Sequence, residues 1–598
     1  MKLRKTKIVC TMGPAVRDLE LLKQLLLAGM NVARLNCAHG DHQYHAETVA
    51  LVREASRQTG IPAALLLDIK GPEIRTGRTK NDQPITLLTG QTLILTTEEV
   101  EGTAERLSIS YQNLPNEVAP GIHIYIADGT VDLEVMRVEG PAIYCAIKQG
   151  ETIGSRKNVN VLGVRTALPA VTEKDKRDIG FGVAQKMDFI AASFIRKSAD
   201  ILEIRKILDE SQANIPVIAK IEDAEGVANI DEIINVSNGI MVARGDLGVQ
   251  LKTEEIPLVQ KRIIRKCNKA NQPVITATQM LDSMMHSPRP TRAESSDVAN
   301  AIFDGTDAVM LSGETASGKY PLLAVQTMHN IAVEVENSPE YAEQIKKYFD
   351  TFEPDRDIAT AIAKAGFITA DNINASAILT PSIRGNTPKL ISKYRPPQQI
   401  IAVTTTAEVQ RNLLLYWGIY PIVAELAQDS ETMVTNAIKI ALQKKYIGNG
   451  ERIVMVAGIP IKSPIMLNTI RVHVISTILG KGREGFGKLC AGRVVKAVDL
   501  NEAVLRVQGE ADEILVTKTL NKSFKPLLRN LKGIILEEYS TLSPDEIQML
   551  NPDVAFISGV FNALASFEPG MIISLDGEEK LIYEGVVEEK HLPKLNAI

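Results

Sequence analysis

The chain has 598 residues, 45% of them hydrophobic, and a formal net charge of −5, so we expect several domains with large cores. It contains no dense basic tract, which argues against a nucleic acid or an anionic membrane as a partner. The five scattered cysteines include no Cys-x-x-Cys pair, which argues against disulfides and structural zinc. No apolar run approaches the length of a membrane span, and the first residues are too polar for a signal peptide. Together these features favour a cytoplasmic protein.

Short apolar runs with polar last residues recur through the first half of the chain. They cover residues 6–13, 30–36, 63–70, 187–193, 215–222, 239–246, 273–279 and 307–314. Helical spacing follows most of them, for example over 19–28 and 256–270. Apolar strands that alternate with helices are typical of a parallel sheet covered on both faces. These units predict an α/β protein with a (β/α)8 TIM barrel, whose active site lies at the mouth where the strands end.

The rhythm is interrupted between Lys70 and about Ala167, where apolar and polar residues nearly alternate and glycine-containing turns recur. That pattern predicts an inserted all-β domain, which would cover the barrel mouth as a lid. We therefore expect the barrel domain in residues 1–70 and 168–340 and the lid in residues 71–167.

Two further segments follow the barrel. Strands and helices alternate again over residues 355–476, which predicts an open α/β domain within 341–478. The glycine-rich stretch 480–488 reads as a linker, and residues 490–598 read as another small α/β domain.

The expected mouth of the barrel combines carboxylates with positive charge. Glu222 and Asp246 end neighbouring strands, and one or two carboxylates are the usual protein contribution to a Mg²⁺ site. Lys220 would lie beside that ion and neutralise a phosphoryl group, since phosphoryl transfer depends on positioning and charge. The turn at Gly245 and Asp246 would offer backbone N–H groups to an oxyanion.

Each of these residues also has an ordinary structural explanation. Lys220 and Glu222 are two positions apart on one strand, and an isolated pair of this kind is more often a structural ion pair than a catalytic one. Arg34 and Arg75, which would add anion contacts, are equally weak signals alone. Polar residues at the ends of so many strands are harder to explain structurally, because barrel folds place functional groups there.

Several motifs together make the pattern specific. They include "TKIVCTMGPA", "MNVARLN", "LLDIKGPEIRTG", "IAKIEDAEGV", "MVARGDLGV", "PVITATQML", "PRPTRAE" and "SDVANAIFDGTDAVMLSGETASGKYP". In these residues and in their order, the chain resembles the pyruvate kinase family over nearly its whole length. The resemblance implies transfer of a phosphoryl group from phosphoenolpyruvate to ADP, which gives pyruvate and ATP, with Mg²⁺ (or Mn²⁺) and K⁺ as cofactors.

The resemblance also implies roles at the mouth. Lys220 and Arg34 would contact the phosphoryl group, Glu222 and Asp246 would hold the Mg²⁺ ion, and Thr278 would help to protonate the enolate. The substrate-binding residues that it implies are Lys220, Gly245, Asp246, Thr278, Ser193 and Ser312, with Ser312 a weaker proton-relay candidate.

For the nucleotide and the monovalent cation, the resemblance implies two overlapping sets. The nucleotide would face Asn36, His39, Arg75 and Lys157. A K⁺ ion would be bound by Asn36, Asp68 and Ile69. The sequence departs from the family pattern here, since Cys37 and Ala38 stand where the family has Phe-Ser and Ile69 where it has threonine. We expect the K⁺ site to be weakened and the phosphoryl-transfer centre to be intact.

Residues 380–388, "TPSIRGNTP", link an expected strand to a helix. The family places a sugar-phosphate effector here, and a nest at a helix N-terminus suits a phosphorylated metabolite. The candidate residues are Ser382, Arg384, Gly385, Asn386 and Thr387. An ordinary polar turn is the structural alternative. The resemblance also implies a homo-oligomer, expected to be a homotetramer.

The segment 490–598 looks like the swivelling phosphohistidine domain found in some bacterial members. Its working motif is Thr-Ser-His, but the corresponding loop, 539–545, reads Tyr-Ser-Thr-Leu-Ser-Pro-Asp. His591 is the only histidine of the segment and lies outside the motif. Since the relay needs an imidazole nitrogen, we predict that this domain carries no phosphoryl group.

A second hypothesis is a non-catalytic paralogue that binds metabolites as a sensor. The discriminating feature is the core set of Arg34, Lys220, Glu222, Asp246 and Thr278, all of which are present. A protein without catalysis has no need of buried charges that are costly to keep, so the sequence favours an active enzyme.

Overall fold

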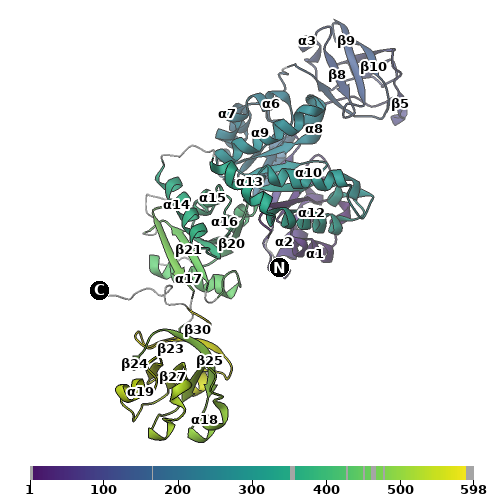
Figure 1. Cartoon of the computed structure of the whole chain (residues 1–598). Coiled ribbons are helices and arrows are strands. Elements are labelled where there is room, and N and C mark those ends of the chain that lie inside the picture. Colours follow the sequence, from purple (N-terminus) through teal and green to yellow (C-terminus); the bar gives the residue numbers. More distant parts are fainter. Residues whose placement is uncertain are drawn as a thin grey trace. The chain divides into compact units, whose positions relative to one another are not determined.

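The computed structural model describes residues 4–164, 166–350, 357–425, 429–448, 451–459, 467–475 and 478–587. The chain divides into two compact units, one of residues 1–361 with 382–425 and the other of residues 362–381 with 426–598. Figure 1 shows the elements of each. His591 lies outside the described residues. No helix in the described part is long and apolar enough to cross a membrane.

The first unit contains a closed barrel of eight parallel strands, as predicted. The strands are β1 (Lys7–Thr11), β2 (Val32–Asn36), β3 (Ala64–Ile69), β13 (Phe189–Ala192), β14 (Val217–Ile221), β15 (Gly239–Ala243), β16 (Val274–Ala277) and β17 (Ala308–Leu311). Nearly every strand residue is buried because one face fills the barrel interior and the other packs under the helices. The carboxyl ends of the strands therefore share one mouth.

Capping residues fix where the barrel helices begin and end. Asp18 precedes α1 (Leu19–Ala28) and accepts a hydrogen bond from the backbone N of Leu21 at 2.8 Å, while Gly29 ends the helix with a φ of +116°. A capping box of Thr172 and Asp175 starts α4 (Glu173–Ala184). The other long barrel helices are α2 (His42–Thr59), α5 (Ser198–Glu210), α9 (Ile256–Lys269), α10 (Arg292–Phe303) and α12 (Pro321–Glu336), with α7 (Ile230–Val236) shorter.

The insertion after β3, which we call the lid, is built mainly of β-strands, as predicted, with one short helix, α3 (Leu114–Glu117). Its larger sheet has the order β4-β12-β8-β9-β10-β6-β7, and β5 (Ile85–Thr86) pairs with β11 (Thr152–Ile153). The sheet strands are β4 (Ile74–Arg75), β6 (Thr92–Thr96), β7 (Arg106–Ser108), β8 (His123–Ile126), β9 (Val131–Glu139), β10 (Ala142–Gln149) and β12 (Asn158–Val161). Alternate residues of β9, beginning with Val131, Leu133 and Val135, are buried in a core of the lid's own.

Residues 382–425 belong to the same unit as the barrel. They contain α15 (Asn386–Ser392), β19 (Gln399–Thr404), α16 (Ala407–Asn412) and β20 (Ile419–Val423). A buried ion pair ties this segment to the barrel floor: Arg395 contacts Asp307 at 2.7 Å and also donates to Asn268 and to the carbonyl oxygen of Gly305, both at 2.9 Å.

The second unit contains strands of two sheets. β18 (Ala377–Pro381) pairs in parallel with β21 (Arg452–Ala457), which pairs antiparallel with β22 (Thr469–Val474), and α17 (Ser430–Gln443) precedes β21. α14 (Ile358–Asn372) precedes β18. These elements agree with the α/β pattern expected after the barrel.

The C-terminal sheet begins earlier than expected. Its order is β23-β30-β29-β25-β26-β27-β28-β24, and the bounds are β23 (Ile478–Lys481), β24 (Glu484–Phe486), β25 (Cys490–Lys496), β26 (Glu513–Thr517), β27 (Gly533–Leu536), β28 (Ala555–Ser558), β29 (Ile572–Asp576) and β30 (Leu581–Glu584). The linker interpretation of residues 480–488 is therefore wrong. Its glycines allow close strand approach, because a Cβ at Gly485 would lie 2.6 Å from the carbonyl oxygen of Gly577.

Candidate active site

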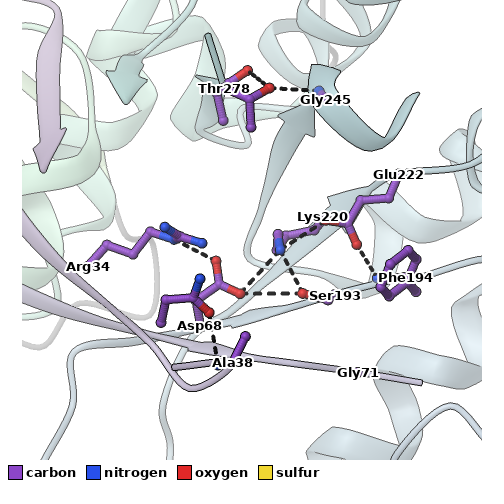
Figure 2. Close-up of polar contacts among 12 residues, drawn as sticks. Arg34, Ala38, Asp68, Gly71, Ser193, Phe194, Lys220, Glu222, Gly245 and Thr278 are labelled. Carbon is purple, nitrogen blue, oxygen red and sulfur yellow. Dashed lines mark hydrogen bonds and ion pairs between the residues drawn. The ribbon is translucent and has the colours of Figure 1, made fainter. Parts of the chain in front are cut away.

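A lysine held by several oxygens lies at the barrel mouth. Lys220, on β14, is 8% exposed, and its Nζ lies 2.9 Å from Glu222 Oε1 and 3.2 Å from Asp68 Oδ1. It also donates a hydrogen bond of 2.6 Å to Ser193 Oγ, just after β13. Figure 2 shows these side chains converging from three strands. The strand ends thus bring together Lys220, Glu222, Asp68 and Ser193, as barrel geometry predicts.

Arg34 completes this charged cluster. Its Nε lies 2.6 Å from Asp68 Oδ2, and its guanidinium donates to Thr11 Oγ1 at 2.9 Å. Asp68 is 1% exposed and lies between the two cations. Burial opposes ionisation of Asp68, but Arg34 and Lys220 hold the pKa of its carboxyl below the usual range. Burial also opposes the charge on Lys220, but Asp68 and Glu222 outweigh it and raise the lysine pKa well above the usual range.

Two acidic residues fit a divalent cation. Glu222 is 2% exposed, and its Oε2 accepts a 2.6 Å hydrogen bond from the backbone N of Phe194. Asp246 lies in the first turn of α8 (Arg244–Gln250). Burial, and then the charge of Glu222, raise the pKa of Asp246 to about 7. Two partly desolvated carboxylates that repel each other suit a hard cation such as Mg²⁺.

The remaining ligands of such an ion would come from elsewhere. Among the described residues, no group of three or more His, Cys, Asp or Glu side chains is placed to hold a metal. Mg²⁺ usually keeps waters and substrate oxygens in its coordination shell. Two carboxylates are within the number that Mg²⁺ usually takes from a protein.

Thr278 is held in an unusual backbone conformation. Its φ is +66°, which is rare for a β-branched residue and is typical of functional sites. Its hydroxyl accepts a 2.7 Å hydrogen bond from the backbone N of Gly245 and donates one of 2.7 Å to the carbonyl oxygen of Ala277. The Gly245 N–H predicted to receive a substrate carboxylate is thus bonded to Thr278 in this structure (Figure 2).

Arg244 supports this strained turn and was missed by the sequence interpretation. It donates to the carbonyl oxygens of Ala277 at 3.1 Å and Thr278 at 2.7 Å, and it pairs with Asp297 at 2.7 Å. The only sequence signal was its place before Gly245 in "ARGD".

Ser312 follows β17 at the same mouth. Its backbone N donates to Glu314 Oε2 at 2.7 Å. Its hydroxyl oxygen is buried and has no hydrogen-bond partner among the described residues. A buried hydroxyl without a partner is costly, which is compatible with a substrate or water partner.

The proposed K⁺ residues lie on neighbouring strands. Asn36 and Asp68 are paired residues of β2 and β3, and Ile69 follows Asp68 on β3. Asn36 Oδ1 accepts a 3.0 Å hydrogen bond from the backbone N of Ala38, the residue that lacks the family's hydroxyl. Oxygen donors thus remain at this edge of the mouth, although the Asp68 carboxylate also serves Arg34 and Lys220.

The proposed nucleotide residues divide between barrel and lid. His39 follows β2 and donates its backbone N–H to the carbonyl oxygen of Asn36 at 3.1 Å. Arg75 lies on β4 of the lid, where it pairs with Glu73 at 2.6 Å and donates to the carbonyl oxygen of Arg156 at 2.8 Å. Lys157 immediately precedes β12. Asn36 and His39 therefore lie together after β2, and Arg75 and Lys157 lie at the paired strands β4 and β12 of the lid.

A pocket of about 320 Å³ lies between barrel and lid residues. Barrel residues Phe194, Arg196 and Asp246 line it, together with Glu73 and Asn158. It contains a proposed metal ligand, Asp246, and is thus continuous with the mouth.

The expected effector loop forms a tight turn. The backbone N of Ser382 donates to the carbonyl oxygen of Val403 at 2.8 Å, and Gly385 has a φ of +76° before α15. Arg384 is exposed, whereas Thr387 is 4% exposed. Asn386 begins the helix.

Comparison with known proteins agrees with the family resemblance seen in the sequence. Residues 3–325 match the family model "Pyruvate kinase, barrel domain", residues 360–473 match "Pyruvate kinase, alpha/beta domain", and residues 509–580 match "PEP-utilising enzyme, mobile domain". A pyruvate kinase from Geobacillus stearothermophilus is 46% identical over 97% of this chain and 99% of that protein. A pyruvate kinase from Staphylococcus aureus (strain USA300) is 43% identical over 98% of this chain and 99% of that protein.

A solved structure is also similar. A pyruvate kinase from Cryptosporidium parvum has a TM-score of 0.75 and 42% identity, and the match covers 78% of this chain and 96% of that one. With relatives of this identity over nearly its full length, the chain belongs to the pyruvate kinase family, enzymes that transfer the phosphoryl group of phosphoenolpyruvate to ADP to form pyruvate and ATP in glycolysis.

Proposed function

We propose that Lys220, Arg34, Glu222, Asp246 and Thr278 carry the reaction in this protein. The observation that supports this most strongly is the buried Lys220 ammonium, held by Asp68, Glu222 and Ser193 at the barrel mouth. A charge fixed in a partly desolvated site stabilises a transferring phosphoryl group without reorganisation at the moment of reaction. The structural alternative, an ion pair without catalytic use, does not explain why a second cation and two further carboxylates meet there.

The residues divide the chemistry as follows. Lys220 and Arg34 bind the phosphoryl oxygens, and Glu222 and Asp246 supply carboxylate ligands to Mg²⁺ (or Mn²⁺). When bound, that ion neutralises phosphoryl and carboxylate charge as a Lewis acid. Phosphoryl loss leaves the enolate of pyruvate, whose methylene carbon must accept a proton. The Thr278 hydroxyl helps to deliver this proton and regains one from water, and Ser312 is a second relay candidate.

The same proposal covers substrate and cofactor contacts. Gly245 and Asp246 bind the substrate carboxylate through their backbone, which requires the Gly245 N–H to leave Thr278 or to share with it. Ser193 acts through Lys220, because its hydroxyl oxygen accepts a hydrogen bond from the Lys220 ammonium. Asn36, His39, Arg75 and Lys157 face the nucleotide, and Asn36, Asp68 and Ile69 bind K⁺.

The cation requirement tests this proposal. Pyruvate formation from phosphoenolpyruvate and ADP is expected to stop when Mg²⁺ is removed with a chelator. Dependence on K⁺ is expected to survive in weakened form, because Ala38 offers no hydroxyl while Asn36, Asp68 and the Ile69 carbonyl remain. Titration of KCl against tetramethylammonium chloride measures this. Full activity without a divalent ion would contradict the Glu222–Asp246 assignment, and full activity without K⁺ would contradict the K⁺ site.

The turn at residues 382–387 is proposed to bind a phosphorylated metabolite. The exposed Arg384 would pair with its phosphate, with Ser382, Gly385, Asn386 and Thr387 around it. We expect Arg384→Ala to abolish activation by phosphorylated metabolites while Arg262→Ala, a change of an exposed arginine on α9, leaves it intact. Effector titrations of both variants measure this, and an unchanged response of Arg384→Ala would reject the site.

The C-terminal domain is proposed to carry no phosphoryl group, despite its similarity to the mobile domain of PEP-utilising enzymes. The loop hydroxyls already serve the backbone: Thr541 Oγ1 donates to the carbonyl oxygen of Leu520 at 3.2 Å, and Ser543 caps α19 (Pro544–Leu550). Neither has the activating base that a hydroxyl nucleophile needs. Incubation with labelled phosphoenolpyruvate followed by mass spectrometry is expected to find no phosphate in residues 478–587; stoichiometric acid-labile phosphate there would contradict this.

Two further proposals rest on the family. The chain forms a homo-oligomer, expected to be a homotetramer, and works in the cytoplasm. The domain limits stay as expected from the sequence, with the C-terminal domain extended to begin at Ile478 because β23 belongs to its sheet.

A further inference from the structure

The lid is joined to the barrel by two connections. The outgoing one leaves β3 at Ile69 and passes Gly71, and the returning one runs from the end of β12 at Val161 to the start of α4 at Glu173. Any movement of the lid must be accommodated in these connections, since both ends are anchored in packed elements. The barrel groups that hold the connections are therefore able to set the lid's position.

One buried arginine holds the returning connection. Arg196 follows β13 and is 8% exposed. Its Nη1 donates to the carbonyl oxygen of Thr166 at 2.9 Å and to Thr166 Oγ1 at 3.2 Å, and its Nη2 donates to the carbonyl oxygen of Leu168 at 2.8 Å. Three hydrogen bonds from one planar guanidinium fix both the distance and the direction of the connection.

Ion pairing with a carboxylate does not account for the position of the Arg196 side chain. The nearest carboxylate, that of Asp200, is 4.0 Å from Arg196 Nε, and Nε has no hydrogen-bond partner among the described residues. Asp200 instead accepts from the backbone N of Arg196 at 2.9 Å and of Lys197 at 3.2 Å. The Asp200 carboxylate thus stabilises the backbone of the turn. The short hydrogen bonds of the Arg196 guanidinium all go to the returning lid connection.

The same turn holds the catalytic groups. Ser193 Oγ accepts from Lys220, and the backbone N of Phe194, whose φ is +55°, donates to Glu222. The outgoing connection lies against it too, because a Cβ on Gly71 would come within 2.8 Å of the carbonyl oxygen of Ser193. Figure 2 shows Gly71, Ser193 and Phe194 around Lys220 and Glu222. Four consecutive residues, 193–196, thus contact both connections and two groups of the phosphoryl-transfer centre.

We propose that Arg196 is a positioning residue for the reaction, which clamps the returning lid connection to the turn that orients Lys220 and Glu222. The inference rests on the proposed function, because it assigns the lid residues Arg75 and Lys157 to the nucleotide. Loss of the clamp lets the lid and those residues drift, whereas the contacts of Ser193 Oγ with Lys220 and of the Phe194 backbone N with Glu222 persist. The effect therefore falls on ADP more than on phosphoenolpyruvate.

The test compares Arg196→Met with a matched control, Arg205→Met. Arg205, on α5, also donates to a backbone carbonyl, that of Val236, at 2.9 Å, and to Asn238 at 2.9 Å, but it touches neither lid connection. Arg196→Met is expected to lower kcat/KM for ADP about tenfold or more and to change KM for phosphoenolpyruvate less than about threefold. Amide hydrogen exchange of residues 166–172 is expected to accelerate about tenfold or more. Arg205→Met is expected to change neither quantity.

Three outcomes are decisive. Kinetics and exchange of Arg196→Met equal to those of Arg205→Met would overturn the proposal. If Arg196→Met does not fold, Arg196→Lys, which restores a single donor group, carries the same test and is expected to give intermediate values; wild-type values for Arg196→Lys in both measurements would overturn it. Failure of the proposed nucleotide assignment is recognised separately: amide exchange of Arg196→Met would then accelerate as expected, while its kcat/KM for ADP stayed at the value of Arg205→Met.

Discussion

Lys220→Met is expected to lower kcat about a thousandfold, equivalent to about 4 kcal/mol of transition-state stabilisation. Methionine nearly matches the length of the lysine stem but supplies no charge where the phosphoryl group develops it. Arg34 still neutralises Asp68 in this variant, so we expect the fold to persist with reduced stability. Steady-state assays of pyruvate formation, with circular dichroism to confirm folding, measure both effects.

A matched control distinguishes the loss of positive charge at the barrel mouth from the loss of a lysine elsewhere in the protein. Lys206→Met makes the same chemical change on an exposed position of α5 and is expected to behave as wild type. Residual kcat of Lys220→Met within about tenfold of the control would reject the proposed role, because removal of a single preorganised group in such sites usually costs more.

Asp68→Asn is expected to reduce both stability and activity strongly. The carboxylate is the shared counter-ion of Arg34 and Lys220, and asparagine keeps its shape but leaves two buried cations facing each other. Breaking a buried ion pair by removing one partner typically costs about 3–5 kcal/mol. We expect a loss of this order in the free energy of unfolding and at least about a hundredfold loss in kcat. Urea titration and steady-state kinetics provide the two values.

The control for Asp68→Asn is Asp188→Asn. Asp188 is 3% exposed and pairs with Arg411 at 2.8 Å, and it also accepts from the backbone N of Leu65 at 2.8 Å. It immediately precedes β13, at the opposite end of the strand from the mouth. This variant is expected to lose stability and to keep kcat. An Asp68→Asn enzyme that is destabilised but turns over like Asp188→Asn would show that Asp68 is structural only.

The barrel could be predicted from the sequence because its signals are local. Each strand is a short apolar run that ends in a polar residue, and helix limits follow from nearby caps such as Asp18 and Gly29. The lid was equally predictable, since alternation along β9 reports one buried face. These patterns need no knowledge of which residues meet in space.

The arrangement of the site depends on contacts between distant residues and could not be read from spacing. Asp68 was assigned only to K⁺ through the family resemblance, yet its carboxylate also bridges Arg34 and Lys220, which come from different strands. Arg244 and Arg196 gave no signal of their own because both act on backbone carbonyls, which any sequence provides. An arginine within a few residues of the end of a barrel strand, as Arg244 is after β15 and Arg196 after β13, is the nearest thing to a sequence signal for such support.

Glycines misled the interpretation at the start of the C-terminal sheet. The glycines of residues 480–488 favour a linker by composition, but Gly482 and Gly485 lie where strands approach closely. A Cβ at Gly482 would come within 2.9 Å of the carbonyl oxygen of Ser558. Composition alone does not distinguish a glycine that is needed because two strands approach closely from a glycine that is needed for backbone flexibility.

Phosphorus NMR of the purified protein with phosphoenolpyruvate, ADP, Mg²⁺ and K⁺ follows phosphoryl transfer at the centre around Lys220 without a coupling enzyme. The phosphoenolpyruvate signal is expected to fall as the γ-phosphate signal of ATP rises by the same amount, and the folded Lys220→Met variant is expected to show neither change over the same period. An unchanged phosphoenolpyruvate signal with folded wild-type protein, or equal ATP formation by Lys220→Met, would contradict this expectation.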